Sequence, residues 1–510
     1  MSAMKFAAVF IPALLAALSS FAGIRMPAIF SDNMVLQSGM PLKFWGWADP
    51  GASVEIALGK GRFKCLADSE GAWSVSVPPQ RADANAQKVE VFEDSKLSKT
   101  IRNVLVGEVW IAGGQSNMEF KLGADGRAKE SAAAADFPLV RVFVQSDRSV
   151  AVEPQRDSPK GASWKVCSPR TAPRFSAVGF YFARTLFEGL NVPVGVVETP
   201  YSGSIMACWL ARDDLSGIKC YEDSLKKFDS ENASYDYGAE MEKYRVKLAE
   251  YKERAEAVKA EGGDVAALKK PSAPQIARGN PMLAPCLQYN AKIAPIAGFA
   301  ARGVAWYQGE SDVKINPEDF ARKFERLIVS WRKYWGIPDL AFCFVQLPSI
   351  DRDGWDIVRL RQAEVALGTP RTAMAVTVDM GDRKNVHPVN KLDVGVRLGR
   401  QALLKFYGHK GIADFPSLKS AKFGEDSVRL EFAAPNSSLR IEGEPRGFEV
   451  MAGGEWVKPD IKRRGGILAL SAPGRRIDAV RYLFKGWAAP DACVFNADGL
   501  PLAPFEISRK

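Results

Sequence analysis

The sequence predicts an α/β protein in which a parallel sheet forms the central domain and β-rich modules flank it. The central part alternates buried-type strand runs, such as residues 192–199 and 341–347, with helical stretches, such as residues 176–190 and 320–336. Alternating strands and helices imply a parallel sheet that is covered on both faces. Before and after this part, short apolar runs with period-2 patterning alternate with turn residues, which is typical of antiparallel β-structure.

These patterns divide the chain into a leader and three folded parts. We expect a signal peptide at residues 1–22, an N-terminal β module at 23–104, the α/β domain at 105–415 and a second β module at 416–510. Packing of the second β module on the first is compatible with this order, because the α/β domain is threaded between them. Inside the central domain, residues 215–274 are rich in Lys, Glu and Ala and predict an exposed, charged helical insertion.

The first residues have the pattern of an export signal. Lys5 precedes the apolar run 6–18, and the small-x-small sequence that ends at Ala22 resembles a signal peptidase site. No later stretch approaches the roughly 18 continuous apolar residues of a membrane span. The first cysteine is Cys65, so a lipid anchor is not expected either. We therefore expect an exported protein, periplasmic or extracellular, without a membrane anchor.

Charge and metal-ligand spacing exclude several function classes. The formal net charge is +10, but the basic residues are dispersed and are not interleaved with aromatics, so nucleic acid is not an expected partner. The seven cysteines are scattered without a C-x-x-C pair, and no phosphate-binding loop is present. The sequence therefore predicts neither a metal nor an organic cofactor, and it leaves disulfide pairing and oligomeric state open.

The segment "VWIAGGQSNMEF", residues 109–120, predicts a strand that runs into a turn and a helix. Ser116 and Glu119 fit the S-x-x-E capping box, in which the serine hydroxyl accepts a helical N–H. A serine at a strand-to-helix turn is also well placed to be a nucleophile, although the G-x-S-x-G elbow is not matched. The local sequence permits both roles.

A nucleophilic serine needs a base, and the chain contains only two histidines. His387 stands in an irregular polar loop between an apolar strand and a helix, where a rigid scaffold can present catalytic groups. His409 follows a helix beside a glycine and is expected to be a helix C-terminal residue. His387 is therefore the candidate base.

Two further loops could supply oxyanion donors. "TPYSGSIMACW" follows a strand and offers the backbone N–H groups of Ser202 and Gly203, and "WYQGESD" offers the side-chain amide of Gln308. Both follow the C-terminal ends of strands, where ligand sites form in open α/β sheets. Glu310 is expected to contact the substrate, although Glu310 and Asp312 could equally serve the structure.

Taken in chain order, these pieces resemble the sialate O-acetylesterase family of carbohydrate O-acetylesterases, which are SGNH-type hydrolases. The resemblance begins at "IFSDNMVLQ" and "FWGWADPG", continues through "GEVWIAGGQSNMEF", "FSAVGFYFARTL", "WYQGESD" and "NVHPVNK", and ends at "NADGLPLAPF". It implies an SGNH-type, flavodoxin-like parallel-sheet domain that is flanked by N- and C-terminal β-sandwich modules. It also implies that Ser116 is the nucleophile, that His387 is the general base, and that the N–H of Ser116 joins Gly203 and Gln308 in the oxyanion hole.

The chain departs from the family pattern at the third member of the triad. SGNH enzymes commonly have an aspartate three residues before the histidine, and here that residue is Lys384, which cannot accept a hydrogen bond. Asp382 is the nearest upstream carboxylate and is the preferred candidate to orient His387. Asp379 and a main-chain carbonyl are the alternatives. Where similar proteins have two glycines, this chain has Ser202 followed by Gly203.

The resemblance implies a secreted esterase that removes acetyl groups from sugars by Ser-His catalysis through an acetyl-enzyme. The expected substrate is O-acetylated sialic acid. Acetylated xylan or another plant glycan is the alternative within the same chemistry. A third possibility from another class is a carbohydrate-binding protein without catalytic activity.

Overall fold

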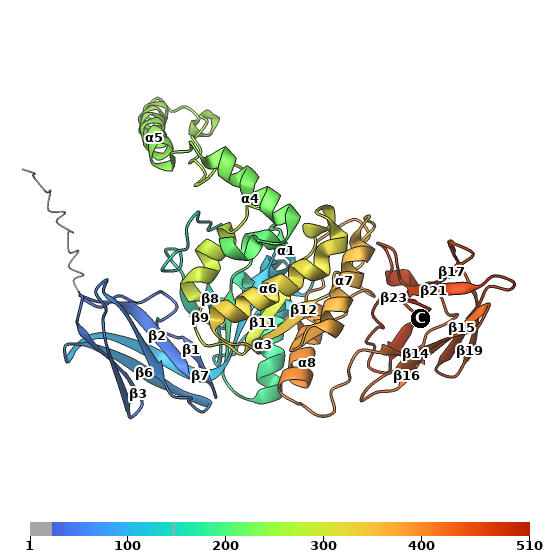
Figure 1. The fold of residues 1–510 in the computed structure, drawn as a ribbon. Coiled ribbons are helices and arrows are strands. Elements are labelled where there is room, and N and C mark those ends of the chain that lie inside the picture. The colour runs from blue at the N-terminus through green and yellow to red at the C-terminus, as the bar shows by residue number, and fades with distance from the viewer. Residues whose placement is uncertain (1–22, 146–147, 510) are drawn as a thin grey trace, which may run out of the picture.

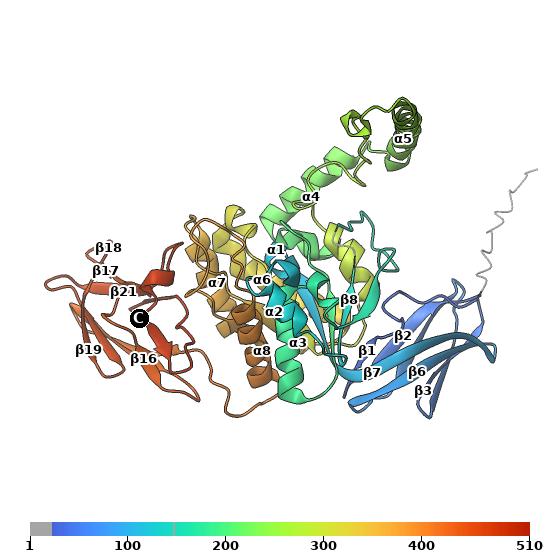
Figure 2. The same ribbon diagram turned by 180° about the vertical axis from the view of Figure 1, so that it is seen from behind.

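The computed structural model describes residues 23–145 and 148–509. The predicted signal peptide lies outside the described residues. Three bodies follow one another along the molecule, with the N-terminal β module at one end, the α/β domain in the middle and the C-terminal β module at the other end (Figures 1 and 2). The two β modules therefore do not pack on each other as the order of the chain had allowed.

Two facing sheets form the N-terminal module. The smaller sheet pairs β2 (Leu42–Trp47) with β5 (Ala72–Val77). The larger one contains β1 (Val35–Gln37), β3 (Ser53–Leu58), β4 (Gly61–Leu66), β6 (Asp83–Glu93) and β7 (Lys96–Gly114). Strand β5 alternates buried and exposed residues, as a strand with one face on a core does.

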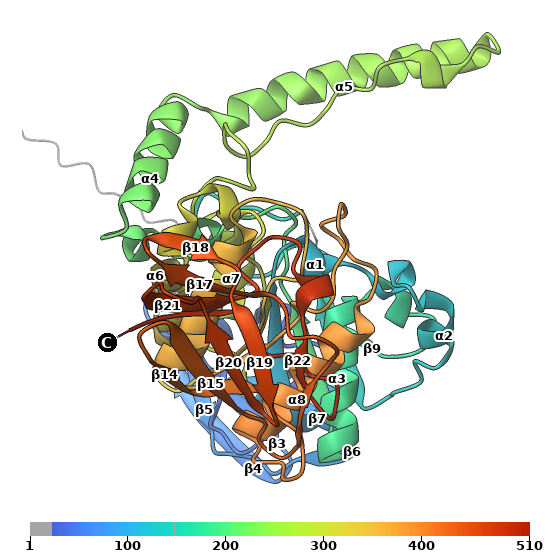
Figure 3. The ribbon, with the colours of Figure 1, turned by 90° about the vertical axis from the view of Figure 1, so that its right-hand side faces the viewer.

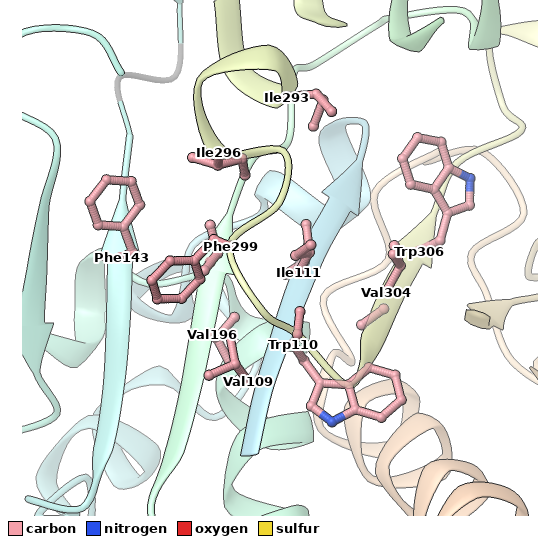
Figure 4. Close-up of a cluster of buried hydrophobic side chains, with 14 of the residues drawn as sticks. Val109, Trp110, Ile111, Phe143, Val196, Ile293, Ile296, Phe299, Val304 and Trp306 are labelled. Carbon is pink, nitrogen blue, oxygen red and sulfur yellow. The ribbon is translucent and has the colours of Figure 1, made fainter. Parts of the chain in front are cut away.

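Strand β7 joins the N-terminal module to the α/β domain without a linker. Its first half pairs with β6 in the module, and its second half pairs with two strands of the central sheet. The second half is fully buried, because helices cover both faces of the central sheet. Figure 4 shows three consecutive residues of this half, Val109, Trp110 and Ile111, within a shared apolar cluster. The nucleophile candidate lies two residues beyond the end of this continuous strand.

The central sheet is parallel except for its last edge strand. Its order is β13-β12-β11-β7-β10-β8-β9, with only β9 antiparallel. The strands besides β7 are β8 (Val140–Val144), β9 (Ser163–Val166), β10 (Val194–Glu198), β11 (Gly303–Tyr307), β12 (Ala341–Val345) and β13 (Thr372–Ala375). This arrangement confirms the predicted parallel sheet.

The order of the five core strands agrees with the flavodoxin-like expectation. Flavodoxin-like sheets have the order 2-1-3-4-5, and β10-β7-β11-β12-β13 have this order when these five strands are numbered along the chain. Strand β8 and the antiparallel β9 extend the sheet beyond β10. The burial of the strands agrees with this order. All five residues of β10 are buried, so this strand lies in the interior beside β7, whereas the partly exposed β9 follows β8 and forms the edge.

Helices cover both faces of the central sheet. The longer ones are α3 (Ala177–Leu190), α6 (Phe320–Trp335), α7 (Trp355–Gly368) and α8 (Leu392–Phe406); α1 (Ser116–Glu119) and α2 (Ala128–Ala133) are short. Trp110 of β7 packs on Phe182 of α3, while Trp306 of β11 packs on Trp331 of α6. Trp306 pairs with Gly113, three residues from Trp110, so the two indoles point to opposite faces. Thus α3 and α8 cover one face, and α6 and α7 the other.

The C-terminal module is a β-structure with its own apolar core. One four-stranded sheet contains β14 (Ser417–Phe423), β15 (Ser427–Ala433), β19 (Asp460–Arg464) and β20 (Ile467–Ser471). A second contains β17 (Phe448–Ala452), β18 (Glu455–Val457), β21 (Ile477–Tyr482) and β23 (Phe505–Ser508), and β16 (Leu439–Ile441) pairs with β22 (Val494–Asn496). This core is separate from the core that the N-terminal module shares with the α/β domain.

The charged insertion leaves the body of the α/β domain. It contains α4 (Lys219–Asn232) and α5 (Tyr237–Ala260), and α5 has no buried residue. Figure 3 shows α5 extending far from the rest of the molecule. Within the described residues, none of the helices combines the length and the hydrophobicity that crossing a membrane requires.

Candidate active site

Ser116 lies at the C-terminal end of β7, at the start of α1. Gly114 has φ +129°, and a Cβ at this position would lie 2.1 Å from the Tyr307 carbonyl oxygen, so only glycine fits. The next residue, Gln115, donates its N–H to the same oxygen at 3.0 Å. This close approach fixes the turn that presents Ser116 beside the end of β11.

The capping box does not form at Ser116. Gln115, not Ser116, is the N-cap residue of α1, and it makes no side-chain cap bond. Glu119 instead accepts the N–H and the hydroxyl of Ser202, at 2.7 and 2.6 Å. Among the residues that the structure describes, no group hydrogen bonds to the Ser116 hydroxyl, and the residue is partly exposed. The helix therefore leaves this hydroxyl free for chemistry.

Asn117 connects the serine turn to the histidine loop. Its side-chain nitrogen donates to the Val386 carbonyl oxygen at 2.9 Å and to Glu310 at 2.6 Å. Its side-chain oxygen accepts a hydrogen bond from Lys391. Asn117 follows Ser116 in the chain and Val386 precedes His387, so these bonds bring the two catalytic candidates to the same edge of the sheet.

Glu310 and Lys391 both hydrogen bond to the Asn117 side chain, and we call these three residues the Asn117 network. All three residues are at most 9% exposed. Burial raises the pKa of Glu310 to about 7, against the hydrogen bond from Asn117, and burial lowers the pKa of Lys391 to about 8. The hydrogen bonds of the Asn117 network fix the geometry of the groups around it, although the second carboxylate oxygen of Glu310 has no hydrogen-bond partner among the described residues.

The environment of His387 favours its neutral form. Partial burial lowers its pKa, the positive charges of Lys391 and Arg352 lower it further, and Glu119 opposes them. A histidine with a lowered pKa is unprotonated at neutral pH and can accept a proton from an alcohol. This is the protonation state that a general base needs.

Neither aspartate near His387 hydrogen bonds to its ring. Asp382 accepts the N–H groups of Lys384 and Asn385 at 2.8 and 2.7 Å, so its carboxylate closes the local turn. Asp379 forms a two-armed ion pair with Arg397 at 2.7 and 2.8 Å. The preferred expectation for Asp382 therefore differs from the structure, because adjacent backbone donors occupy this carboxylate.

Of Ser202 and Gly203, only Gly203 has a backbone N–H that is available to stabilise an oxyanion. The Ser202 N–H is donated to Glu119, whereas no acceptor for the Gly203 N–H lies among the described residues. Gly203 has φ +76°, and a Cβ would lie 2.3 Å from the Met282 sulfur. Its carbonyl accepts the Ser311 hydroxyl at 2.9 Å, which holds the loop in place.

Gln308 lies beneath the Gly203 loop and is fully buried. Its amide nitrogen donates to the Ser204 carbonyl at 3.2 Å and to Asp312, which in turn accepts the Met206 N–H at 2.9 Å. The amide hydrogens thus hold the loop and do not point at a free position. Glu310 is likewise turned inward to Asn117, so it does not contact a substrate in this arrangement.

Sequence reasoning did not single out Asn117, Lys391, Ser311 or Glu119 for their roles in this site. All four stand inside the quoted motifs "GQSNMEF", "WYQGESD" and "NVHPVNK", so the motifs pointed to the right segments. Polar residue types ordinarily face solvent, and nothing in the sequence marks Asn117 and Lys391 as buried. The motif positions were the only signal that could have found them.

Comparison with known proteins gives consistent results. Residues 282–403 match the family described as "Carbohydrate esterase, sialic acid-specific acetylesterase". The sialate O-acetylesterase of Rattus norvegicus is 26% identical, with 95% of this chain and 94% of that protein covered, and that of Mus musculus is 27% identical, with 96% and 95% covered. A crystal structure of a carbohydrate acetylesterase from Xanthomonas citri has a TM-score of 0.78 and 27% identity, covering 96% of this chain and 100% of that one.

The whole-length relatives, the family match and the solved structure agree with the resemblance found in the sequence motifs. The chain is a carboxylic ester hydrolase related to the sialate O-acetylesterases.

Proposed function

We propose that this protein is an exported, SGNH-type esterase that removes O-acetyl groups from sugars, with O-acetylated sialic acid as its substrate. The observation that carries the proposal is the bond from Asn117 to the Val386 carbonyl, which joins the residue after Ser116 to the residue before His387. The relatives support the same chemistry, since their names are those of sialate O-acetylesterases.

The proposed reaction uses Ser116 and His387 in two steps. His387 takes the proton of the Ser116 hydroxyl as the oxygen attacks the ester carbonyl. The N–H groups of Ser116 and Gly203 stabilise the oxyanion, and the sugar hydroxyl leaves with the proton from His387. Water, deprotonated by His387, then cleaves the acetyl-enzyme to acetate and restores the serine. Gln308 supports the Gly203 loop, and it can donate directly only after its bond to Ser204 breaks.

The substrate proposal is tested by measuring acetate release from defined glycans. The mature protein is incubated with O-acetylated sialic acids, acetylated xylan and acetylated neutral oligosaccharides. We expect the highest kcat/KM for the sialic acids. Higher kcat/KM for xylan would assign the enzyme to plant glycans, and release from none of the substrates would favour a binding protein.

Asp382 is proposed to position His387 through the turn, so its replacement should affect activity more than stability. Asp382→Asn weakens the bonds that close the turn, and we expect kcat to fall by about tenfold because the imidazole is misplaced. Asp379→Asn instead breaks the largely buried pair with Arg397 and should lower the free energy of unfolding by about 3 kcal/mol. Kinetics and denaturant melts of both variants check this. A loss of several thousandfold for Asp382→Asn would mean that the carboxylate contacts the ring.

Lys391→Met should change both the rate and the pH profile. The charge of Lys391 lowers the pKa of His387, so its removal raises that pKa. Because the neutral imidazole is the active form, the acidic limb of kcat/KM should move to higher pH. Loss of the bond to Asn117 should also lower kcat by about 10- to 100-fold. The exposed lysine variant Lys410→Met is the control, and an unmoved acidic limb in Lys391→Met would contradict the proposal.

A further inference from the structure

A large cavity lies beside the catalytic loops. It has a volume of about 1110 Å³ and is lined by residues 148–151 and 154–160, by Tyr201, and by Tyr237 and parts of the segment 273–291. Ligand pockets commonly measure about 300 to 1000 Å³, so this cavity can hold more than one sugar unit. We call it the basic cavity, because four cationic side chains line it: Arg148, Arg156, Lys160 and Arg278.

The positive charge of the basic cavity is not neutralised within the protein. Its single acidic lining residue is Asp157, which accepts the N–H groups of Ala28 and Ser158, both at 2.7 Å. None of the four cations forms an ion pair with any residue in 23–145 or 148–509. All four are exposed, so an anion that enters the cavity can reach them.

Tyr201 joins the basic cavity to the active site. It lines the cavity, and its backbone N–H donates to the Gly114 carbonyl at 3.0 Å, two residues before Ser116. The next residues along the chain are Ser202 and Gly203, which form the proposed oxyanion loop. Tyr201 therefore lies between the proposed oxyanion loop and the cavity, so a sugar whose acetyl group reaches Ser116 can extend past Tyr201 into the cavity.

Residues 232–237, between α4 and α5, and residues 273–279, where the charged insertion rejoins the α/β domain, form one wall of the basic cavity; we call these two segments the insertion root. The Tyr235 hydroxyl donates to the Gln275 carbonyl at 2.5 Å, and the Arg278 guanidinium lies 5.3 Å from the centre of the Tyr235 ring. Asn232 accepts the Arg278 N–H at 2.7 Å. These contacts tie the end of α4 to the returning chain and hold Arg278 at the cavity, although α5 itself projects away (Figure 3).

We infer that the basic cavity binds the carboxylate of an acidic sugar in the substrate, and that the insertion root supplies part of this subsite. A cleft lined by charge of one sign concentrates the opposite charge, and guanidinium groups match a carboxylate with paired N–H donors. The inference rests on the proposed deacetylation at Ser116. The ligand is a sugar that carries both a carboxylate and an O-acetyl group. Sialic acids and uronic acids are the two classes of sugar that fit this description.

The inference is tested with the triple variant Arg156→Gln, Lys160→Gln, Arg278→Gln. Its control, Lys458→Gln, Lys462→Gln, Arg464→Gln, removes the same charge from exposed positions in the C-terminal module. Relative to wild type, the triple variant should lose about tenfold or more in kcat/KM on O-acetylated N-acetylneuraminic acid, and it should keep its kcat/KM on uncharged p-nitrophenyl acetate. The control should keep both. Equal losses on the two substrates, or no loss on the acidic one, would overturn the subsite.

A binding experiment separates this inference from the proposed function. Ser116→Ala is titrated with N-acetylneuraminic acid, glucuronic acid and neutral glucose, with and without the triple substitution. Binding of either acid that the triple substitution abolishes supports the subsite, and the tighter acid identifies the source. Binding of neither acid overturns it. Absence of acetate release by wild type would contradict only the proposed function and not the subsite, because this titration needs no turnover.

Discussion

Ser116→Ala should lower kcat for acetate release by about 10⁴-fold or more, because it removes the atom that forms the acetyl-enzyme. The variant should fold normally, since the Ser116 hydroxyl has no hydrogen bond among the described residues and is not the cap of α1. The measurement is turnover of p-nitrophenyl acetate and of O-acetylated sialic acid, together with the mass of enzyme quenched during turnover. Wild type should accumulate a covalent acetyl adduct, and Ser116→Ala should show none.

A matched serine variant separates chemistry from general damage. Ser230→Ala changes an exposed serine in α4, which is not part of the catalytic loops, and should keep wild-type turnover. Unchanged activity in Ser116→Ala would mean that another residue is the nucleophile. Turnover by neither wild type nor Ser116→Ala would favour a carbohydrate-binding protein over an esterase.

The fold was predictable where burial leaves a clear pattern. The alternation of apolar runs and amphipathic helices predicted the parallel sheet, and the period-2 runs predicted the β-structure at both ends. The sequence did not reveal that β7 crosses from the N-terminal module into the central sheet, because its first half is polar and largely exposed whereas its second half is buried, and this change of pattern resembles a boundary between two strands. The resemblance implied the 2-1-3-4-5 order of the core strands, but the two strands β8 and β9 that extend the sheet beyond β10 were not predicted.

The candidate site was predictable as segments but less so as contacts. Ser116, His387 and Gly203 came from loops that follow strands, and the parallel sheet gathers such loops at one edge. The roles given to Asp382, Gln308 and Glu310 assumed that each side chain points to the reacting centre. In the structure, nearer backbone groups or buried partners occupy all three, and a local hydrogen bond to an adjacent N–H is not visible in residue spacing.

His387→Ala should remove activity almost completely, with a loss of about 10⁴-fold, while His409→Ala should keep most of it. His387 stands beside Asn117 and Val386 at the serine turn, and its lowered pKa keeps the imidazole neutral at pH 7. His409 lies beyond α8, where its ring bonds to the Gly189 carbonyl at 2.9 Å and ties two segments of the scaffold. Its removal should therefore cost about 1 kcal/mol of stability.

The two histidine variants form an internal comparison, because the chain has no other histidine to act as base. Rates on p-nitrophenyl acetate and thermal melts of both variants would be measured at pH 7. If His409→Ala were inactive and fully folded while His387→Ala turned over, the base assignment would be wrong. If both variants retained activity, no imidazole would act as the base. A buried group such as Glu310, with its pKa raised to about 7, would then be the remaining candidate near Ser116.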